Sequence, residues 1–392
     1  MTYPFKICDS IHGFIRFGEH ELQVIDSTPF QRLRYILQMG TAYLVYPGAT
    51  HTRFEHSLGV MEQVTRIYQI LIAPHTQMIS LSKTAEELSY WLLILRLAAL
   101  CHDLGHLPFS HTAEKTLLPD GGHEKMTRAL ICSPELQAIW RTIGPQAETD
   151  IIKLALSNPE CSLTPWEKVL SQIITEDNFG ADRIDYLIRD GRCTGVGYGQ
   201  FDYHQLIDSL RILPDGDHLS LGVTISGMQS VESLWIARYM MYARVYHHPK
   251  SRVFTNHMHR FMGRHYRDQI LTNPAQYIKH TDYTLLAALN QAAEEGDYDA
   301  KCLLKREKAF CEVTLAPDID LLKLKRQFGD DIFIEHVPPK LPKRHFPVVT
   351  EDGSVISSLQ TSAFLREIPQ GGKPLCIYIH PKRLSELKSC ST

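Results

Sequence analysis

The chain has 392 residues, of which 44% are hydrophobic and 22% are charged, so it is long enough for one large core and a smaller second region. A net charge of −3 argues against a surface that binds nucleic acid broadly or lies on a membrane. The nine cysteines form no CxxC pair, and with no recognisable signal peptide they favour a cytoplasmic protein without a cysteine-based zinc site.

Helical patterns dominate the first part of the chain. Thr28 and Pro29 are residue types that favour a helix start, and the apolar residues after them predict a helix over Thr28–Met39. A loop is expected at Gly40–Thr52, where proline and glycine occur. Helical spacing of apolar residues predicts six further helices, namely Arg53–Ala73, Ala85–Cys101, His123–Ile131, Thr164–Thr175, Asp182–Arg189 and Met228–Tyr246. The second of these is apolar nearly all round, so we expect it at the centre of the core.

Strand patterns come later in the chain. Asp217–Ile225 alternates and has the pattern of a β-hairpin. Four short runs after about residue 300 are typical of strands, namely Phe310–Leu315, Asp331–Val337, Phe346–Val349 and Pro374–Ile379. A proline-rich connection covers Val337–Pro347. The predicted fold is therefore mostly α, with a helical core over 1–300 that includes a small β-hairpin, and a C-terminal α+β region over 301–392.

The tract Cys101–His111, CHDLGHLPFSH, ends the predicted central helix and places His102 beside Asp103. His56 and Asp182 belong to two other predicted helices. Each of these two alone has an ordinary interpretation, His56 as a core histidine and Asp182 as a helix cap. Together, imidazole and carboxylate ligands suit a divalent ion such as Mn, Fe, Mg, Co, Ni or Zn. Such an ion activates water against a phosphate, so the set suggests phosphoester chemistry.

Longer strings around these residues carry a family resemblance. HTRFEHSLGV, LAALCHDLGHLPFSHTAE, GGHEK and ADRIDYLIRD occur in this order and resemble the HD-domain phosphohydrolases. The similarity is greatest to the deoxynucleoside triphosphate triphosphohydrolases, which include the vertebrate sterile-alpha-motif and HD-domain enzyme and its bacterial relatives. It covers roughly residues 5–260 and fades beyond them. The resemblance implies an HD-domain helical core and hydrolysis of dNTPs to deoxynucleoside and inorganic triphosphate, with metal-activated water attacking the α-phosphorus.

The resemblance also implies roles for the residues of these motifs. The metal ligands would be His56, His102, Asp103 and Asp182. His123 matches the general acid to the leaving group, and Glu124 beside it could orient the ring. Two pocket histidines would face the phosphates, His106 and His111. Glu114 stands where the family often has Asp, behind the histidines, where a carboxylate fixes a tautomer.

Further matches concern the substrate. Three basic residues match phosphate contacts of the family, namely Arg53, Arg183 and Arg238. Gln38 and Asp190 would hydrogen-bond the 3′-hydroxyl. Tyr246 would pack under the sugar and leave no room for a 2′-hydroxyl. Tyr186 and His248 would line the same pocket.

In the vertebrate enzyme a guanine nucleotide at a subunit interface assembles a tetramer. Its contact positions are matched here by Asp26, Gln31 and Arg34, although Asp26 could instead cap a helix and Arg34 could be a surface residue. Cys8 stands where that family has an Asn. The resemblance thus implies a homo-oligomer, dimer or tetramer, and a nucleotide activator.

Two other functions remain open from the sequence. One is an HD-type nucleotidase or phosphodiesterase that acts on another phosphoester. The other is a nucleotide sensor or a single-stranded nucleic-acid binder with a degenerate site. The intact ligand set and the net charge of −3 favour an enzyme with a small-molecule nucleotide substrate and without nucleic-acid or membrane partners.

Overall fold

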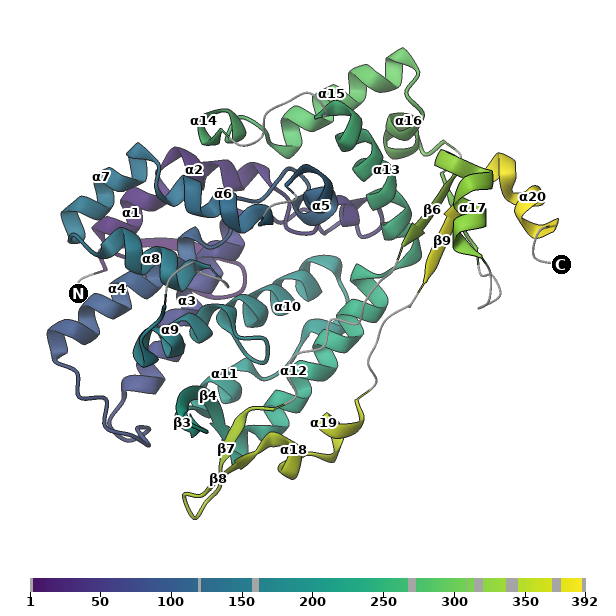
Figure 1. Cartoon of the computed structure of the whole chain (residues 1–392). Coiled ribbons are helices and arrows are strands. Elements are labelled where there is room, and N and C mark those ends of the chain that lie inside the picture. Colours follow the sequence, from purple (N-terminus) through teal and green to yellow (C-terminus); the bar gives the residue numbers. More distant parts are fainter. Residues whose placement is uncertain are drawn as a thin grey trace.

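The central helix forms with its predicted bounds, Ala85–Cys101 (α4), and packs between α3 (Arg53–Ile72) and α8 (Ala147–Ala155) in the computed structural model (Figure 1). The structure describes residues 3–118, 121–156, 162–266, 273–307, 309–313, 320–335, 345–368 and 375–389. α4 begins at a capping box, in which Thr84 accepts from the Glu87 backbone and Glu87 accepts in return.

Only the second half of α4, Ile94–Cys101, is buried, so the expectation that this helix lies at the centre of the core is confirmed for that half. The first part of the chain contains further helices. They are α1 (Glu19–Ile25), α2 (Thr28–Arg32), α5 (Glu114–Leu117), α6 (Gly122–Ile131), α7 (Pro134–Ile143), α9 (Pro165–Thr175), α10 (Ala181–Thr194), α11 (Tyr203–Asp208) and α12 (Met228–Met241). The predictions for α3, α4, α6, α9 and α10 are confirmed within a few residues, except that α10 runs five residues further, to Thr194. α12 continues as one wider π-helical turn over Tyr242–Tyr246, so the prediction of a helix to Tyr246 is confirmed as well.

The predicted helix Thr28–Met39 is wrong in its second half. After α2 the chain makes a single 3-10 turn at Leu33–Tyr35, and Ile36 is extended. Leu37 then forms a β-bridge with Thr52, and its backbone N–H donates to a carboxylate oxygen of Asp282 at 2.9 Å. These contacts with distant parts of the chain outweigh the local helical spacing. The predicted loop at Gly40–Thr52 contains one 3-10 helix, Gly40–Leu44.

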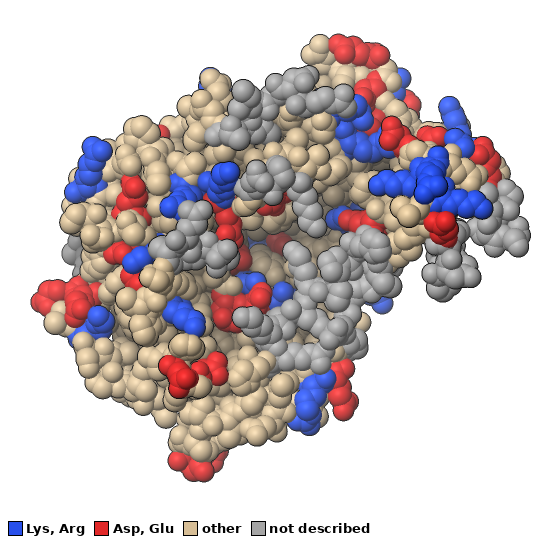
Figure 2. All heavy atoms as spheres, viewed as in Figure 1, with Lys and Arg blue, Asp and Glu red and all other residues tan. Residues whose placement is uncertain are grey.

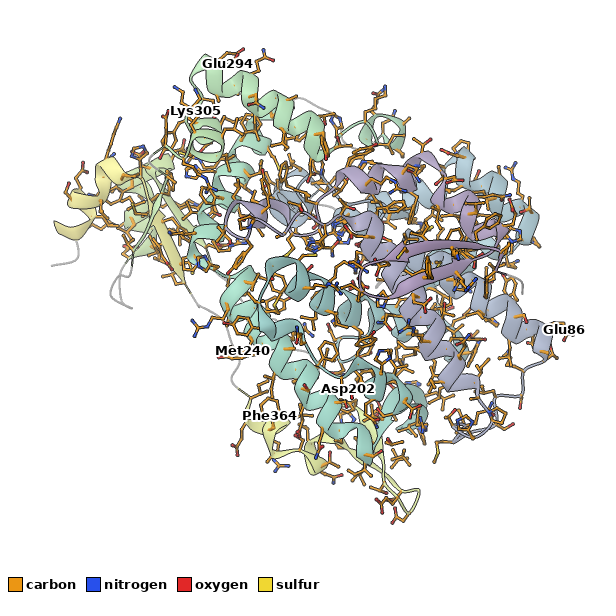
Figure 3. The ribbon with its side chains drawn as sticks, turned by 180° about the vertical axis from the view of Figure 1, so that it is seen from behind. Glu86, Asp202, Met240, Glu294, Lys305 and Phe364 are labelled. Atoms are coloured by element: carbon orange, nitrogen blue, oxygen red, sulfur yellow. The ribbon has the colours of Figure 1, made fainter. Side chains whose placement is uncertain are left out.

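The later helices lie at the top, the right end and the bottom of the molecule as drawn in Figure 1. They are α13 (Pro249–His265), α14 (Pro274–Tyr277), α15 (Asp282–Glu295), α16 (Tyr298–Lys305), α17 (Leu321–Phe328), α18 (Ser358–Thr361), α19 (Ala363–Glu367) and α20 (Leu384–Ser389). Seen from behind, the return of the chain places Phe364 of α19 below Met240 of α12 (Figure 3). Phe364 packs against the main hydrophobic core.

Three small sheets complete the fold. A hairpin at the N-terminus pairs β1 (Phe5–Asp9) with β2 (Gly13–Phe17). A second sheet has the order β3-β4-β7-β8, with β3 (Leu210–Asp215), β4 (His218–Thr224), β7 (Pro347–Val349) and β8 (Val355–Ser357). A third has the order β5-β9-β6, with β5 (Cys311–Val313), β6 (Ile332–Glu335) and β9 (Cys376–Ile379).

The predicted hairpin at Asp217–Ile225 is one strand of a longer hairpin, because its partner is β3. Pro214 breaks the strand pattern of β3, and the edge position of that strand explains why the proline is tolerated. The four predicted C-terminal strands are confirmed in their described parts, whereas 314–315, 336–337 and 374 lie outside the described residues. Most of the predicted proline-rich connection also lies outside them.

The C-terminal strands divide between two sheets. β7 pairs in parallel with β4 of the helical part. Among the described residues, β5, β6 and β9 pair only with one another, beside a small core that includes Leu324 and Phe328. These pairings do not decide where the helical core ends, so the division of the chain at residue 300 stays a prediction.

Charges are mixed over the helical part of the face seen in Figure 2, and basic side chains gather mainly at its right end. In the part of the chain that the structure describes, every helix is too short or too polar to cross a bilayer.

Candidate active site

Four predicted metal ligands meet where three helices converge. His56 comes from α3, His102 and Asp103 follow the end of α4, and Asp182 lies in the first turn of α10. The Nε2 atom of His56 is 3.0 Å from Oδ1 of Asp182 and 3.6 Å from Oδ2 of Asp103. The Nε2 atom of His102 is 3.6 Å from Oδ1 of Asp103 and 3.8 Å from Oδ1 of Asp182. The structure thus brings all four side chains together.

The donor set fits a divalent cation. Nδ1 of His102 donates to the Ala99 carbonyl at 2.7 Å, so its Nε2 atom carries a lone pair. This Nε2 atom is buried and has no hydrogen-bond partner among the described residues. Nδ1 of His56 donates to Oδ2 of Asp185 at 2.8 Å and likewise directs Nε2 at the carboxylates. Ring nitrogen lone pairs and carboxylates that face one another repel unless a cation lies between them, as in carboxylate–histidine–metal sites.

The charges around the ligands agree with this interpretation. Burial opposes a charge on the His56 ring, but the carboxylates of Asp182 and Asp185 raise its pKa to about 10. Burial alone would raise the pKa of Asp103, yet the Arg53 guanidinium, which forms an ion pair with it, holds that pKa well below its usual range. The carboxylates therefore stabilise positive charge at Nε2 of His56, as a proton or as a divalent cation in its place.

A buried network behind the ligands was missed by the sequence analysis. Asp185 accepts from His56, from Nε2 of His12 at 2.6 Å and from the Arg189 guanidinium, which also donates to Asp9. Asp185 lies about one turn of α10 after the predicted ligand Asp182, and this spacing within ADRIDYLIRD is the sequence signal that could have found it. The network fixes the tautomer and the position of the His56 ring.

Gly59 lets this network form. A Cβ atom at Gly59 would overlap the Asp185 carboxylate and the Arg189 guanidinium, so only glycine allows α3 and α10 to approach this closely. That approach brings His56 and Asp182 within reach of one metal ion.

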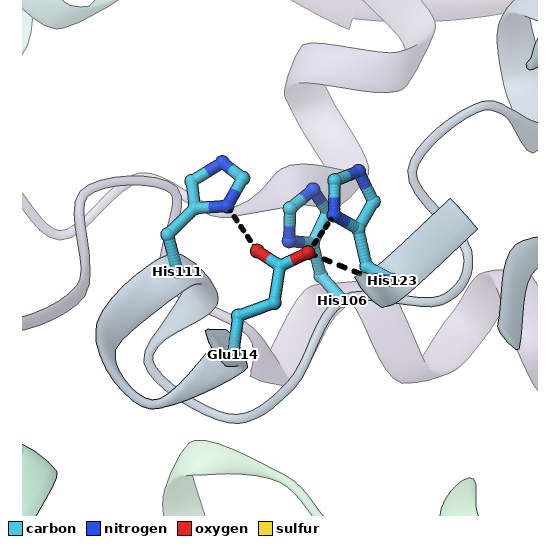
Figure 4. Close-up of side chains that lie close together, drawn as sticks. All are labelled: His106, His111, Glu114 and His123. Atoms are coloured by element: carbon cyan, nitrogen blue, oxygen red, sulfur yellow. Dashed lines mark hydrogen bonds and ion pairs between the residues drawn. The ribbon is translucent and has the colours of Figure 1, made fainter. Parts of the chain in front are cut away.

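A second cluster of side chains lies beside the ligands and consists of His106, His111, Glu114 and His123 (Figure 4). One oxygen of Glu114 lies 2.6 Å from Nδ1 of His123 and 2.9 Å from its backbone N–H, and the other lies 2.6 Å from Nδ1 of His111. Burial alone would raise the pKa of Glu114, but the hydrogen bonds from the two rings lower it. Glu114 therefore holds both rings as an ionised acceptor.

The assignment of ring orientation to Glu124 is wrong, because the described contacts give Nδ1 of His123 to Glu114. Neighbouring residues on a helix point in different directions, whereas α5 and α6 bring Glu114 and His123 face to face. A Cβ atom at Gly122 would overlap the Glu114 carboxylate, so this glycine keeps the space for the contact.

His106 connects the two clusters. Its ring stacks on that of His123 with centroids 3.9 Å apart, and its Nε2 lies 3.1 Å from Oδ1 of Asp103. Burial and the Arg53 guanidinium hold the pKa of His106 well below its usual range. His106 lies in a loop and His111 in a 3-10 turn after Phe109, whose φ of 56° is left-handed, so the two histidines do not share a helix face. The side chain of His111 is 61% exposed and free to meet a ligand.

The three predicted phosphate contacts are placed differently. Arg53 is buried at the metal ligands, where it pairs with Asp103 and donates to Oγ of Ser110 at 2.9 Å. Arg183 donates to the Thr175 and Glu176 carbonyls, both at 2.9 Å, and pairs with Asp177. Arg238 donates to the Asp177 carbonyl at 2.7 Å. Arg183 and Arg238 thus share the turn that leads into α10.

The predicted sugar contacts form one group. Oδ2 of Asp190 accepts from the Tyr246 hydroxyl at 2.7 Å, and its Oδ1 accepts from Nε2 of His51 at 2.6 Å. Tyr186 lies against Tyr246 with ring centroids 6.4 Å apart. Oε1 of Gln38 is buried and has no hydrogen-bond partner among the described residues. His51 was not among the predicted contacts, and the clustering of histidines that begins with His51 and His56 was the available signal.

His248 lies beyond this group, where its ring contacts Tyr46 at 5.9 Å between centroids. The predicted activator contacts lie between the end of α1 and the 3-10 turn Leu33–Tyr35 that follows α2. Gln31 donates to the Ile25 carbonyl at 2.7 Å, and Arg34 donates to Oε1 of Gln31 at 2.8 Å. Asp26 ends α1, and both it and Arg34 are exposed. These residues form a small polar surface apart from the ligand cluster.

Comparisons with known proteins agree with the geometry. A model of the HD domain matches residues 53–187, and a model of the HD-associated region matches residues 201–311. An uncharacterized protein of Methanocaldococcus jannaschii is 32% identical over 365 residues, which are 88% of this chain and 72% of that protein. A hypothetical protein from Aquifex aeolicus superimposes with a TM-score of 0.82 at 31% identity, over 98% of this chain and 99% of that one.

A vertebrate relative is also similar. The deoxynucleoside triphosphate triphosphohydrolase SAMHD1 of Mus musculus is 34% identical over 229 residues, which are 52% of this chain. The match covers 34% of that enzyme, so the chain spans about a third of its length.

Proposed function

The chain belongs to the HD-domain phosphohydrolases with an HD-associated region, and on this premise we propose that it hydrolyses deoxynucleoside triphosphates to deoxynucleoside and inorganic triphosphate. The observation that carries the proposal is the arrangement along α10. This helix presents Asp182 to the metal ligands and Asp190 to Tyr246, about two turns or roughly 12 Å further on. One rigid element thus joins a phosphate-side ligand to a sugar-side acceptor.

The metal would be held by His56, His102, Asp103 and Asp182, and when bound it would neutralise phosphate charge and lower the pKa of a water molecule. Arg53, which already touches Asp103 and Ser110, adds fixed positive charge beside the phosphates. Arg183 and Arg238 donate to backbone carbonyls of the same turn before α10 and are proposed to contact the rest of the triphosphate.

The second cluster is proposed to supply the proton that the leaving group needs. Water adds its oxygen to the α-phosphorus while the bond to the 5′-oxygen breaks, and the leaving oxygen needs a proton. Nε2 of His123 is the donor, since Glu114 holds its Nδ1 at 2.6 Å and so fixes the direction of the ring. His106, stacked on that ring, and the exposed His111 are proposed to contact the phosphate oxygens.

The sugar would be recognised by Gln38, Asp190 and Tyr246. A buried carbonyl oxygen without a partner, such as Oε1 of Gln38, gains most from a ligand that donates a hydrogen bond. A sugar hydroxyl is such a donor. The polar side chains of Gln38, Asp190 and Tyr246 therefore favour a nucleoside substrate over a simple phosphoester.

We also propose that the protein is a homo-oligomer that binds a nucleotide activator at Asp26, Gln31 and Arg34. The exposed Arg34 guanidinium, held by Gln31 and stacked 3.5 Å from the Phe54 ring centroid, offers a preformed contact for a planar base or a phosphate. Chromatography with light scattering, with and without GTP, tests this proposal. A monomer whose mass and activity are unchanged by GTP or a second dNTP rejects it.

A substrate panel tests the proposed activity. The protein is incubated with Mn²⁺ or Mg²⁺ and each dNTP, each ribonucleotide, nucleoside monophosphates and a cyclic dinucleotide. Cleavage of dNTPs in preference to the others is expected. Preference for a monophosphate or a diester supports an HD-type nucleotidase or phosphodiesterase instead, and salt-dependent binding of single strands without turnover supports a binding protein.

A further inference from the structure

His51 lies at the junction of every group that the proposed function assigns to the sugar. Its Nε2 is 2.6 Å from Oδ1 of Asp190, and Oδ2 of the same carboxylate accepts from Tyr246 at 2.7 Å. Its backbone carbonyl accepts from the Gln38 N–H at 3.0 Å. One residue therefore fixes Gln38 through its backbone and Asp190 through its ring.

The surroundings of His51 leave it little freedom. The residue is 5% exposed, and Asp190 is 3% exposed. The neighbouring Thr52 forms the β-bridge with Leu37, which holds the two chain segments in register. A Cβ atom at Gly48 would overlap the Cys193 carbonyl, so the loop before His51 lies directly against α10. The ring is thus a fixed spacer between the loop and the helix.

Electrostatics give the contact a second role. A carboxylate in a pocket for a polyanion repels its own ligand unless a positive group compensates it. Burial opposes a charge on the His51 ring, but the contacts with Asp190 and Cys193 raise its pKa to about 9. The imidazolium then offsets the Asp190 charge while each carboxylate oxygen keeps a lone pair for a hydroxyl.

We infer that His51 is a positioning residue for sugar recognition: it orients the Asp190 carboxylate toward the 3′-hydroxyl of the substrate and holds Gln38 beside it. The inference rests on the proposed function and goes beyond it, because His51 itself touches no reacting atom. Its loss should weaken recognition of the hydroxyl rather than the chemical step. Loss of a hydrogen bond to a charged group weakens binding by about ten- to hundredfold.

The test uses the full-length protein, His51→Phe, His51→Gln and the control His218→Gln, whose histidine is exposed on β4. KM and kcat are measured for a dNTP and for its 2′,3′-dideoxy analogue, and thermal unfolding confirms that each variant folds. For His51→Phe we expect KM for the dNTP to rise about tenfold or more, kcat to change little and the preference over the dideoxy analogue to be lost. His51→Gln, which keeps an N–H donor, should retain part of the preference, and His218→Gln all of it.

The outcomes separate the two proposals. A wild-type protein that cleaves no dNTP rejects the proposed function and this inference with it. A wild-type protein that cleaves dNTPs, together with a His51→Phe variant that keeps the preference for the 3′-hydroxyl, overturns the inference alone. An equal loss of kcat on both substrates also overturns it, since a general structural defect would act in that way. If His51→Phe fails to fold, the partial preference expected of His51→Gln decides.

Discussion

Oε1 of Glu114 lies 2.6 Å from Nδ1 of His123 and 2.9 Å from its backbone N–H, so one carboxylate oxygen fixes both the ring and the main chain of the proposed acid. The contact joins α5 to the start of α6 across a glycine pair whose second member, Gly122, has no room for a side chain. An imidazole held in this way presents its other nitrogen in a single direction, which is what a proton donor to a leaving group requires.

Replacing Glu114 should therefore lower the rate of the chemical step. We expect Glu114→Gln to reduce kcat by about a hundredfold, with a small change in KM for the dNTP. Glu114→Asp, which keeps a carboxylate, should lose less. A nucleotide ester with a p-nitrophenolate leaving group needs no acid, so its hydrolysis should be nearly unaffected. Equal losses on both substrates would contradict the assignment of His123 as the acid that Glu114 orients.

Asp103 is expected to be essential for metal binding. Its carboxylate faces both His56 and His102 and pairs with Arg53. Asp103→Ala and Asp103→Asn should each weaken metal binding at least about tenfold and abolish turnover. Metal content by mass spectrometry after dialysis is the measurement, with Asp217→Ala in the exposed hairpin turn as the control. A variant that keeps its metal and activity would remove Asp103 from the ligand set.

Gly59 should be intolerant of any side chain. In Gly59→Ala the new methyl group overlaps Asp185 and Arg189, and overpacking of this kind destabilises by about 1–3 kcal/mol. Because the same contact positions His56 against Asp182, metal affinity should fall with stability. Gly263→Ala on α13 is the matched control: nothing lies within 4 Å of its added Cβ, and a helical alanine is about 1 kcal/mol more favourable. Equal melting temperatures for the two variants would contradict the close packing of α3 and α10.

The contribution of His51 to stability should depend on pH. Its folded pKa of about 9 lies above the ordinary histidine pKa of 6.5, so the folded state binds the proton more tightly. The stabilisation is complete below pH 6.5, is lost as pH rises through 9, and amounts to about 3 kcal/mol. The groups that face the ring are Asp190, with Tyr246 behind it, and Cys193. Thermal unfolding of wild type and His51→Gln between pH 6 and 9.5 should converge as pH rises. Parallel curves would show that the ring is neutral when folded.

The sequence was sufficient for those parts of the site that short-range patterns determine. The helices carrying His56, His102 and Asp182 have apolar spacing and clear ends, and the motif strings named the four side chains that the structure brings together. The place of Glu114 in the motif identified it as a supporting residue. Orientation of the His123 ring, however, was assigned to Glu124, whereas Glu114 makes that contact.

What escaped prediction depends on contacts between distant segments. His12 reaches Asp185 across 173 positions, and Asp282 ends the helical spacing after α2 by accepting the Leu37 N–H from 245 positions away. Neither contact leaves a periodic pattern. The parallel pairing of β7 with β4 is likewise a tertiary choice, since a three-residue strand carries too little pattern to select its partner.

The identity of the product tests the central claim most directly. The protein is incubated with one dNTP and a divalent metal in ¹⁸O-labelled water, and the products are analysed by mass spectrometry. We predict equal amounts of deoxynucleoside and inorganic triphosphate, with one ¹⁸O atom in the triphosphate and none in the deoxynucleoside, because water attacks the α-phosphorus. Release of pyrophosphate or monophosphate, or ¹⁸O in the deoxynucleoside, would contradict it.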